Sequence, residues 1–206
     1  MVKYRFLNQP RLPALEPCLY EYIVAANGLF VRAKRKGMSA MVCVQTFTHQ
    51  VAGLYPALPY LDIAPVNEWI LQSILKQSLA AAPLEKLWWL LPVCYAWGIY
   101  TPLQIASSAA VRPEDPYHPR AVEALVEVHS HHRMPAFFSA TDDKDETGFK
   151  VYAVIGYIHH RPTLRVRVGI YGHFMEIPAE WVFDLPNGIE CAQKRDMEIG
   201  NEQNGF

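Results

Sequence analysis

Two histidines separated by one residue, His129 and His131, are the side chains in this sequence with the clearest potential for chemistry. They end the run Val126-Glu-Val-His-Ser-His131, whose composition is typical of a β-strand. Side chains two positions apart on a strand point to the same face, with backbones about 6.5–7 Å apart. Two imidazoles can therefore converge on one zinc ion, which binds histidine nitrogen at about 2.0–2.1 Å. A catalytic site needs a third protein ligand and leaves a fourth position open to water.

The segment from Ser139 to Asp142 has the form of an N-terminal helix cap. Such a cap fixes the backbone and directs Asp142 back towards the strand, which makes this aspartate the expected third ligand. Asp143 is the competing candidate, but its side chain would point about 100° away around the helix. The residues therefore predict a zinc site made of His129, His131 and Asp142.

The complete pattern, H-x-H, seven residues, Ser, two residues, Asp, resembles the JAMM signature of the JAB/MPN/Mov34 metalloproteases. His129, His131, Ser139 and Asp142 match every position of that signature. The resemblance implies that both histidines and the aspartate bind zinc, and that Ser139 helps to stabilise a tetrahedral intermediate. It also implies a JAB/MPN-like fold, which is a cytidine-deaminase-like mixed β-sheet flanked by helices.

The family further uses a glutamate upstream of the motif, where its first helix gives way to a strand. That glutamate orients and deprotonates the catalytic water, and Glu85 lies at the matching boundary here. The glycine-bearing sequence that usually follows it is replaced by Leu87-Trp88-Trp89. Glu127 is the main alternative, because it shares a strand face with the two histidines; it could instead orient one of them. Glu21 is a more distant candidate.

A third histidine in this run, His132, stands where many family members have proline. On a strand its side chain would point to the face opposite that of His131. We therefore expect His132 to be a rim residue and not a ligand. His159, His160 and His173 are expected to be surface or strand histidines.

The elements around the motif follow from hydrophobic spacing. Pro65 opens a segment with apolar residues at helical intervals, which predicts a helix over 65–82. Strands are predicted at 86–91, 97–105, 124–130, 150–158 and 164–171, and a short helix over 139–146. Residues 21–47 form a predicted antiparallel meander with turns at Asn27-Gly28 and Lys36-Gly37. Residues 1–19 are expected to be irregular, and 50–64 to be a connection.

These elements predict an α+β (α/β) chain with a mixed sheet, a long helix before the metal-binding strand and a short helix after it. We divide it into an N-terminal β-rich extension (1–62), a JAB/MPN-like metalloprotease domain (63–183) and a polar, flexible tail (184–206).

The composition sets limits on partners and compartment. The chain has 206 residues and a net charge of −1, so its overall charge does not favour binding to nucleic acid or to an anionic membrane. The four cysteines form no CxxC pair, and no apolar signal-peptide core follows the N-terminus. Residues 87–111 lack charge but contain Pro92, Pro102 and Gln104, which favours two strands around a turn over a membrane helix. We therefore expect a cytoplasmic protein without membrane or direct nucleic-acid contact.

A narrower resemblance rests on three segments: VEVHSHHRMPAFFSATDDKDETGF, RVRVGIYGHFMEIP and the run from Tyr20 to Arg32. Together they resemble the protein A family of the PRTRC system, a bacterial mobile-element cassette that also encodes ParB-related and ThiF-related proteins. This resemblance implies partners of those two kinds and a substrate that is ubiquitin-like or sulfur-carrier-like.

The resulting hypothesis is a zinc-dependent peptidase or isopeptidase that cleaves at the C-terminal tail of such a protein. Glu85 would transfer the proton and Ser139 would donate to the oxyanion. One alternative is a non-catalytic JAB scaffold or interaction module of the cassette. Another is a DNA-associated protein like RadC, which carries a related H-x-H motif; the near-neutral charge counts against it.

Overall fold

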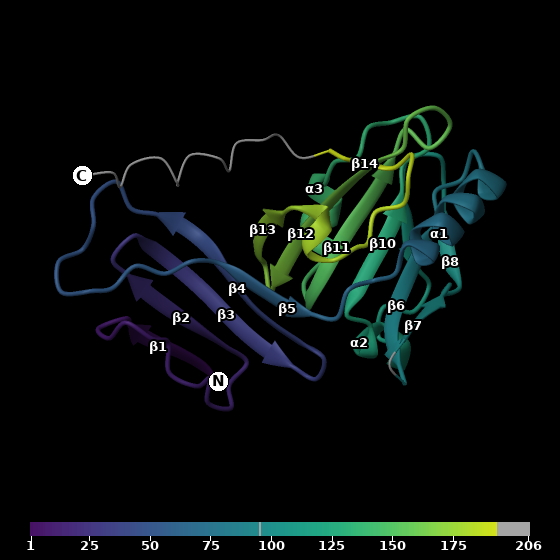
Figure 1. Ribbon diagram of the computed structural model, residues 1–206. Helices are drawn as coiled ribbons and strands as arrows, with labels where there is room; N and C mark the ends of the chain where they lie inside the picture. The colour runs from purple at the N-terminus through teal and green to yellow at the C-terminus, as the bar shows by residue number, and fades with distance from the viewer. Residues whose placement is uncertain (95, 193–206) are drawn as a thin grey trace.

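The computed structural model describes residues 1–94 and 96–192, which form two large β-sheets lying side by side and a small two-stranded ribbon (Figure 1). The strands are β1 (Val2–Phe6), β2 (Tyr20–Ala25), β3 (Gly28–Arg35), β4 (Met38–Thr46), β5 (Tyr60–Ile63), β6 (Leu87–Val93), β7 (Ala96–Tyr100), β8 (Gln104–Ala106), β9 (Val111–Pro113), β10 (Val126–Ser130), β11 (Phe149–Gly156), β12 (Thr163–Ile170), β13 (His173–Ile177) and β14 (Glu190–Cys191). The helices are α1 (Glu68–Ala81), α2 (Pro119–Glu123), α3 (Ala140–Asp145) and a 3₁₀ turn, Ala179–Trp181.

The first sheet is N-terminal and has the order β1-β2-β3-β4-β5. Its centre is the predicted meander, with turns at Ala26-Asn27, one residue before the predicted position, and at Lys36-Gly37 as predicted. Two expectations about its edges were wrong. Residues 2–6 are not irregular but pair with β2 in parallel, and residues 60–63 of the expected connection pair with β4. Neither edge strand adjoins its partner through a tight turn, so the local turn signals that mark a hairpin are missing.

The second sheet has the order β13-β12-β11-β10-β6-β7, and β14 pairs with β12. Strand β10 lies in its centre, parallel to β11 and antiparallel to β6. The uncharged segment 87–111 forms the β6–β7 hairpin and part of the β8–β9 ribbon, as predicted in outline. Within the described part of the chain, no helix is both long and apolar enough to cross a membrane.

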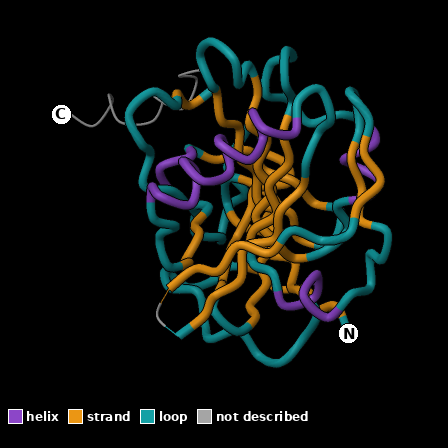
Figure 2. Tube along the Cα trace, turned by 90° about the vertical axis from the view of Figure 1, so that its right-hand side faces the viewer, coloured by secondary structure: helices purple, strands orange, loops and turns teal. Residues whose placement is uncertain are grey.

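Helix α1 covers one face of this second sheet (Figure 2). Its buried side chains Ile70, Leu71 and Ile74 share one hydrophobic core with Val126 and Val128 of β10. Because strand side chains alternate between faces, Glu127 and His129 of β10 point to the opposite face of the sheet. The core also includes side chains of β3 and β4, so both sheets are joined by common packing.

The helix begins three residues later than predicted, at Glu68 and not at Pro65. The reason is a tertiary contact: Val66 forms an isolated parallel bridge with Phe183, and its amide donates to the carbonyl of Val182. This bridge keeps residues before Asn67 extended. At the other end of the chain, β14 gives structure to residues 190–191 of the predicted tail, whereas residues 193–206 lie outside the described residues. The divisions at 62/63 and 183/184 stay predictions.

A glycine at the end of β11 allows the segment after the histidines to cross closely above the sheet. A Cβ atom on Gly156 would lie 2.2 Å from the amide nitrogen of Ala136 and 2.4 Å from the carbonyl carbon of Pro135. These are backbone atoms, so the crossing would have to move. We expect Gly156→Ala to lower the free energy of unfolding by about 1–3 kcal/mol, the usual range for overpacking.

Urea denaturation of the metal-free protein would measure this loss as a shift in midpoint. Gly98→Ala is the matched strand control, because its Cβ would first meet a side-chain methyl of Val93 at 3.1 Å. Equal midpoints for the two variants would contradict the steric argument.

Candidate metal centre

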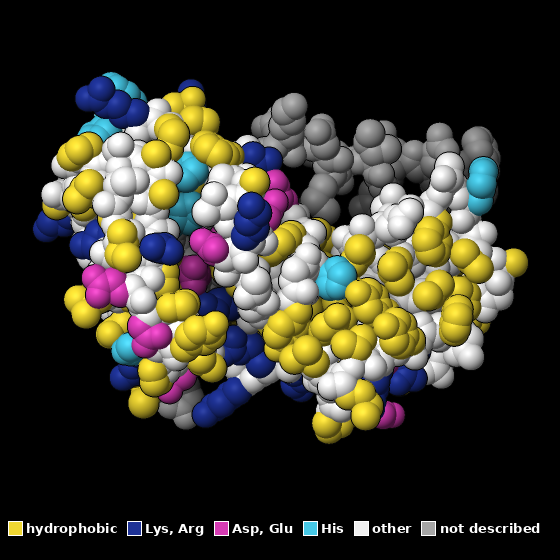
Figure 3. Space-filling view, turned by 180° about the vertical axis from the view of Figure 1, so that it is seen from behind, with side chains coloured by type: hydrophobic (Ala, Val, Ile, Leu, Met, Phe, Trp, Pro, Cys, Tyr) yellow, Lys and Arg dark blue, Asp and Glu magenta, His cyan; other side chains and the backbone are white. Residues whose placement is uncertain are grey.

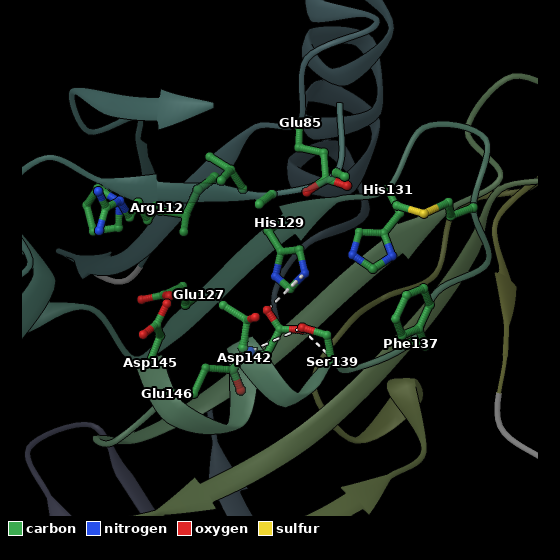
Figure 4. Close-up of a pocket in the computed structure, with 17 residues that line it drawn as sticks. Glu85, Arg112, Glu127, His129, His131, Phe137, Ser139, Asp142, Asp145 and Glu146 are labelled. Atoms are coloured by element: carbon green, nitrogen blue, oxygen red, sulfur yellow. Dashed lines mark hydrogen bonds and ion pairs between the residues drawn. The ribbon is translucent and has the colours of Figure 1, made fainter. Parts of the chain in front are cut away.

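A pocket of about 230 Å³ lies on the face of the second sheet opposite α1 (Figure 4). The end of β10 contributes its floor, and its walls are α3 on one side and residues 109–113 of the β8–β9 ribbon on the other. The lining includes all the residues predicted for the site: Glu85, Glu127, His129, His131, Ser139 and Asp142. The fold therefore brings these side chains together from segments that are far apart in the sequence.

The two histidines turn their rings into the pocket, with ring centroids 5.1 Å apart. His129 belongs to β10, and the amide of His131 continues the pairing by donating to the carbonyl of Ile155. Nδ1 of His131 lies 3.0 Å from the carbonyl oxygen of Pro135. A donor at Nδ1 leaves Nε2 as the lone-pair nitrogen, the usual arrangement for a metal-binding histidine. Burial lowers the pKa of both imidazoles, which favours their neutral, ligating form.

Asp142 is held by the helix cap that the sequence predicts. The amide of Ser139 donates to Oδ2 of Asp142 over 2.5 Å, and the amide of Asp142 donates back to Oγ of Ser139 over 3.2 Å. The second carboxylate oxygen, Oδ1, faces His129 and lies 3.7 Å from its Nε2. Two ligand atoms on a tetrahedral zinc ion lie about 3.4 Å apart. Asp143, the competing candidate, instead binds Arg167 over 2.6 Å.

Glu146 also lies in this pocket, although it was not among the residues predicted from the sequence. Ligand atoms of His129, Asp142 and Glu146 all lie within 4.8 Å of one another. His131 is not part of that close group, so its role as a ligand stays a prediction. The spacing of Asp142 and Glu146 could have revealed this neighbour, because residues four apart share one face of a helix.

Glu85 lies in the segment between α1 and β6, above the histidines (Figure 4). Its side chain is 2% exposed, and its Oε1 has no hydrogen-bond partner among the described residues. Burial, and to a smaller extent the charge of Asp142, raises the pKa of Glu85 to about 7. A buried carboxylate with an unengaged oxygen and a pKa near neutrality has the properties of a general base.

Two hydrogen bonds between Lys86 and Ser130 connect this segment to the end of β10. The amide of Lys86 donates to Oγ of Ser130 over 3.0 Å, and the amide of Ser130 donates to the carbonyl of Lys86 over 2.9 Å. From the other side, the amide of Glu85 donates to the carbonyl of Ser107 over 2.8 Å. The backbone of Glu85 is therefore fixed to the strand that carries the histidines.

The two other glutamates considered as bases differ from Glu85 in their contacts. Glu127 lines the pocket, but its Oε2 accepts from Lys150 over 3.0 Å and from Nε1 of Trp89 over 3.1 Å. Glu21 lies in the first sheet, where it is buried between Arg5 and Arg32 at 2.7 Å from each. Its position outside the pocket removes Glu21 as a candidate.

His132 is not a rim residue, contrary to the expectation. It is 5% exposed, and its Nε2 contacts the carbonyl oxygen of Leu84, next to Glu85. The prediction failed because β10 ends at Ser130 and the chain leaves the strand geometry on which it was based. His159 and His160 are exposed, as expected, and His173 of β13 is half-buried.

The raised pKa of Glu85 has a consequence for stability in the metal-free protein. The folded state keeps the Glu85 proton to a higher pH than the unfolded state does, so stability falls as pH rises from about 4.5 to about 7. Glu85→Gln removes this loss. We expect the variant to be more stable than the parent at pH 8 by about 1–3 kcal/mol, with no difference near pH 4.

Urea denaturation of metal-free protein at both pH values is the measurement, and Glu114→Gln, at an exposed position, is the control. A pH-independent difference between the Glu85 variant and the parent would contradict the assignment.

The segment that forms most of this pocket is similar to a known protein family. Residues 68–168 match the model of the family described as prokaryotic homologs of the JAB domain. Among solved structures, a JAB1/MPN domain protein from Archaeoglobus fulgidus is 16% identical, with 55% of this chain and 94% of that chain covered and a TM-score of 0.39. A protein from Desulfitobacterium hafniense is 18% identical, with 59% and 92% covered and a TM-score of 0.42.

No curated protein matches the chain. The residues matched by the family model extend from the start of α1 into β12 and include every residue predicted for the site. The fold is α+β, as predicted. Over residues 68–168, this chain is therefore similar to the JAB domains of prokaryotes.

Proposed function

We propose that the chain is a zinc-dependent peptidase or isopeptidase of the JAMM type. The observation that carries this proposal is the pairing, in one pocket, of a metal-ligand set with the unengaged carboxylate oxygen of Glu85. The chemistry of the donors fits zinc, because burial lowers the pKa of His129 and His131 and so favours neutral imidazoles, and Oδ1 of Asp142 is directed at the first of them. These three residues would hold the ion. A zinc ion there would polarise a carbonyl group and make water more acidic.

Two other side chains of the pocket would carry out proton transfer and stabilise the oxyanion. Oε1 of Glu85 would accept a proton from water and pass it to the nitrogen of the leaving amine. Oγ of Ser139 already accepts a hydrogen bond from the amide of Asp142, which leaves its hydroxyl hydrogen free to donate. That hydrogen would stabilise the oxyanion formed from the scissile carbonyl. Removing one such donor typically lowers kcat by about 10²–10³-fold.

For the substrate, we propose the C-terminal tail of a ubiquitin-like or sulfur-carrier-like protein. The ribbon wall of the pocket includes two small side chains, Ala109 and Ala110, which leave room for an extended, narrow chain. Such a tail could pair with a strand edge beside the pocket. The resemblance to the protein A family of the PRTRC system supports a cytoplasmic role with ThiF-related and ParB-related partners.

An apolar patch favours a second candidate function, a non-catalytic interaction module of the same cassette. Figure 3 shows hydrophobic side chains gathered over the first sheet. Tyr4 and Phe6 of β1 are 77% and 65% exposed, and their neighbours on β2, Tyr22 and Val24, are half-buried. Exposed patches of this kind are often protein-binding surfaces.

Metal analysis of the purified chain, followed by a cleavage assay, tests these proposals. We expect one zinc ion per chain in the parent and in His160→Ala, an exposed control, but not in His129→Ala. The cleavage probes are ubiquitin joined to aminomethylcoumarin and a bacterial sulfur carrier with a C-terminal peptide extension. Absence of zinc from the parent would reject the metal site. Stoichiometric zinc without cleavage of either probe would favour the interaction module.

A further inference from the structure

Arg167 of β12 is a buried cation beside the candidate metal centre. Its side chain is 5% exposed and lies between two aromatic rings, with the guanidinium carbon 4.1 Å from the ring centroid of Phe138 and 3.9 Å from that of Phe174. Stacking of this kind holds the plane of the guanidinium and directs its N–H groups along fixed lines. The N–H groups of Arg167 point towards α3.

The guanidinium binds two carboxylates at the end of that helix. Nε of Arg167 donates to Oε2 of Glu146 over 2.8 Å, and Nη2 lies 2.6 Å from the same oxygen. Nη1 donates to Oδ1 of Asp143 over 2.6 Å. Glu146 is 5% exposed, so its ion pair with Arg167 is buried on both sides.

Glu146 has a second group of neighbours, which are the candidate zinc ligands. A carboxylate oxygen of Glu146 lies within 4.8 Å of ligand atoms of both His129 and Asp142. A buried carboxylate without its cation is strongly unfavourable. If Arg167 were absent, a metal ion bound between His129 and Asp142 would supply a replacement for the missing positive charge. Glu146 would then occupy a coordination position.

We propose that Arg167 keeps Glu146 out of the coordination shell of the metal and so keeps one position of the site open. Zinc sites with four protein ligands are closed and structural, whereas catalytic sites have three and retain an exchangeable position. Glu146 would close this site if it joined His129, His131 and Asp142. Arg167 is therefore a positioning residue that acts through Glu146. This inference rests on the proposed zinc site.

The test uses Zn²⁺ and Co²⁺ as probes of the full chain, with no substrate. Arg167→Met keeps an apolar, unbranched side chain between the two rings but removes the charge. We expect this variant to bind Zn²⁺ at least tenfold more tightly than the parent in competition with a chromophoric chelator. Its Co²⁺ complex should show a changed absorption spectrum, because ligand number and geometry determine that spectrum.

The decisive comparison is the double variant Arg167→Met, Glu146→Gln, which should return the Zn²⁺ affinity and the Co²⁺ spectrum to the parent values. A merely structural role for Arg167 would weaken metal binding, and Glu146→Gln would not reverse that loss. Either result, unchanged or weakened binding in Arg167→Met, overturns the proposal.

Glu146→Gln alone gives an answer even if Arg167→Met does not fold. Because Arg167 holds Glu146 away, this variant should bind Zn²⁺ with the affinity of the parent. Weaker binding would show that Glu146 is a ligand in the parent and would overturn the inference, while leaving a zinc site in place. Failure of the parent itself to bind Zn²⁺ would instead reject the proposed function, together with the inference that depends on it.

Discussion

Glu85→Gln should lower the rate of amide cleavage by about 10²–10⁴-fold, the usual contribution of general acid–base catalysis. Because glutamine has nearly the shape of glutamate, the geometry of the pocket should stay the same. The rate falls because the glutamine amide cannot accept the proton. Zinc content should also be unchanged, because Glu85 is not among the proposed ligands. The measurement is the single-turnover rate on the sulfur-carrier fusion, with zinc determined on the same samples.

Glu127→Gln is the matched control for this experiment. Glu127 lines the same pocket, but Lys150 and Trp89 engage its Oε2, whereas Oε1 of Glu85 has no partner among the described residues. We expect the Glu127 variant to keep most of the activity. If Glu127→Gln abolished cleavage and Glu85→Gln did not, the two residues would exchange roles.

His131→Ala should remove most of the stabilisation that zinc gives to the folded chain. A ligand present at a thousand times its Kd stabilises the native state by about 4 kcal/mol. For a chain of this size, that corresponds to a rise in Tm of roughly 10 °C. The parent should therefore show such a rise when Zn²⁺ is added after chelation, and His131→Ala should show little or none. Thermal unfolding followed by circular dichroism measures both values.

This experiment also decides between two ligand sets. His131 donates from Nδ1 to Pro135 and turns its ring into the pocket, but Glu146 lies in the closer group with His129 and Asp142. A normal zinc response in His131→Ala, combined with its loss in Glu146→Gln, would replace His131 by Glu146. His160→Ala, on the surface, controls for nonspecific effects of losing an imidazole.

The features that the sequence predicts well are those determined by residues close in the chain. The capping box between Ser139 and Asp142 is a local structure of four residues, and it forms as expected. Helix α1 and the β6–β7 hairpin likewise follow from local spacing. The residues that meet in the pocket could be predicted because the motif resembles that of a known family. The resemblance indicates which distant residues lie together, which the spacing of residues along the chain does not show.

The features that could not be predicted depend on contacts between distant residues. Strand β1 has no turn signal because it pairs in parallel with β2 across a long connection. The burial of His132 follows from its contact with Leu84, which no local pattern encodes. Arg167 appears in the sequence as one polar position of an alternating strand, and its link to Glu146 exists only once β12 and α3 meet.

The two hydrogen bonds between Ser130 and Lys86 join the segment that carries Glu85, the proposed proton-transfer residue, to the strand that carries His129, a proposed zinc ligand. A fluctuation that separates β10 from residues 84–86 would displace Glu85 and expose the histidine strand in the same event. Partly opened molecules would then lose both functions at once, so a state that holds the ion without its base should be rare. Amide hydrogens of Lys86 and Ser130 should accordingly exchange with solvent at one common rate, as members of a single cooperative unit.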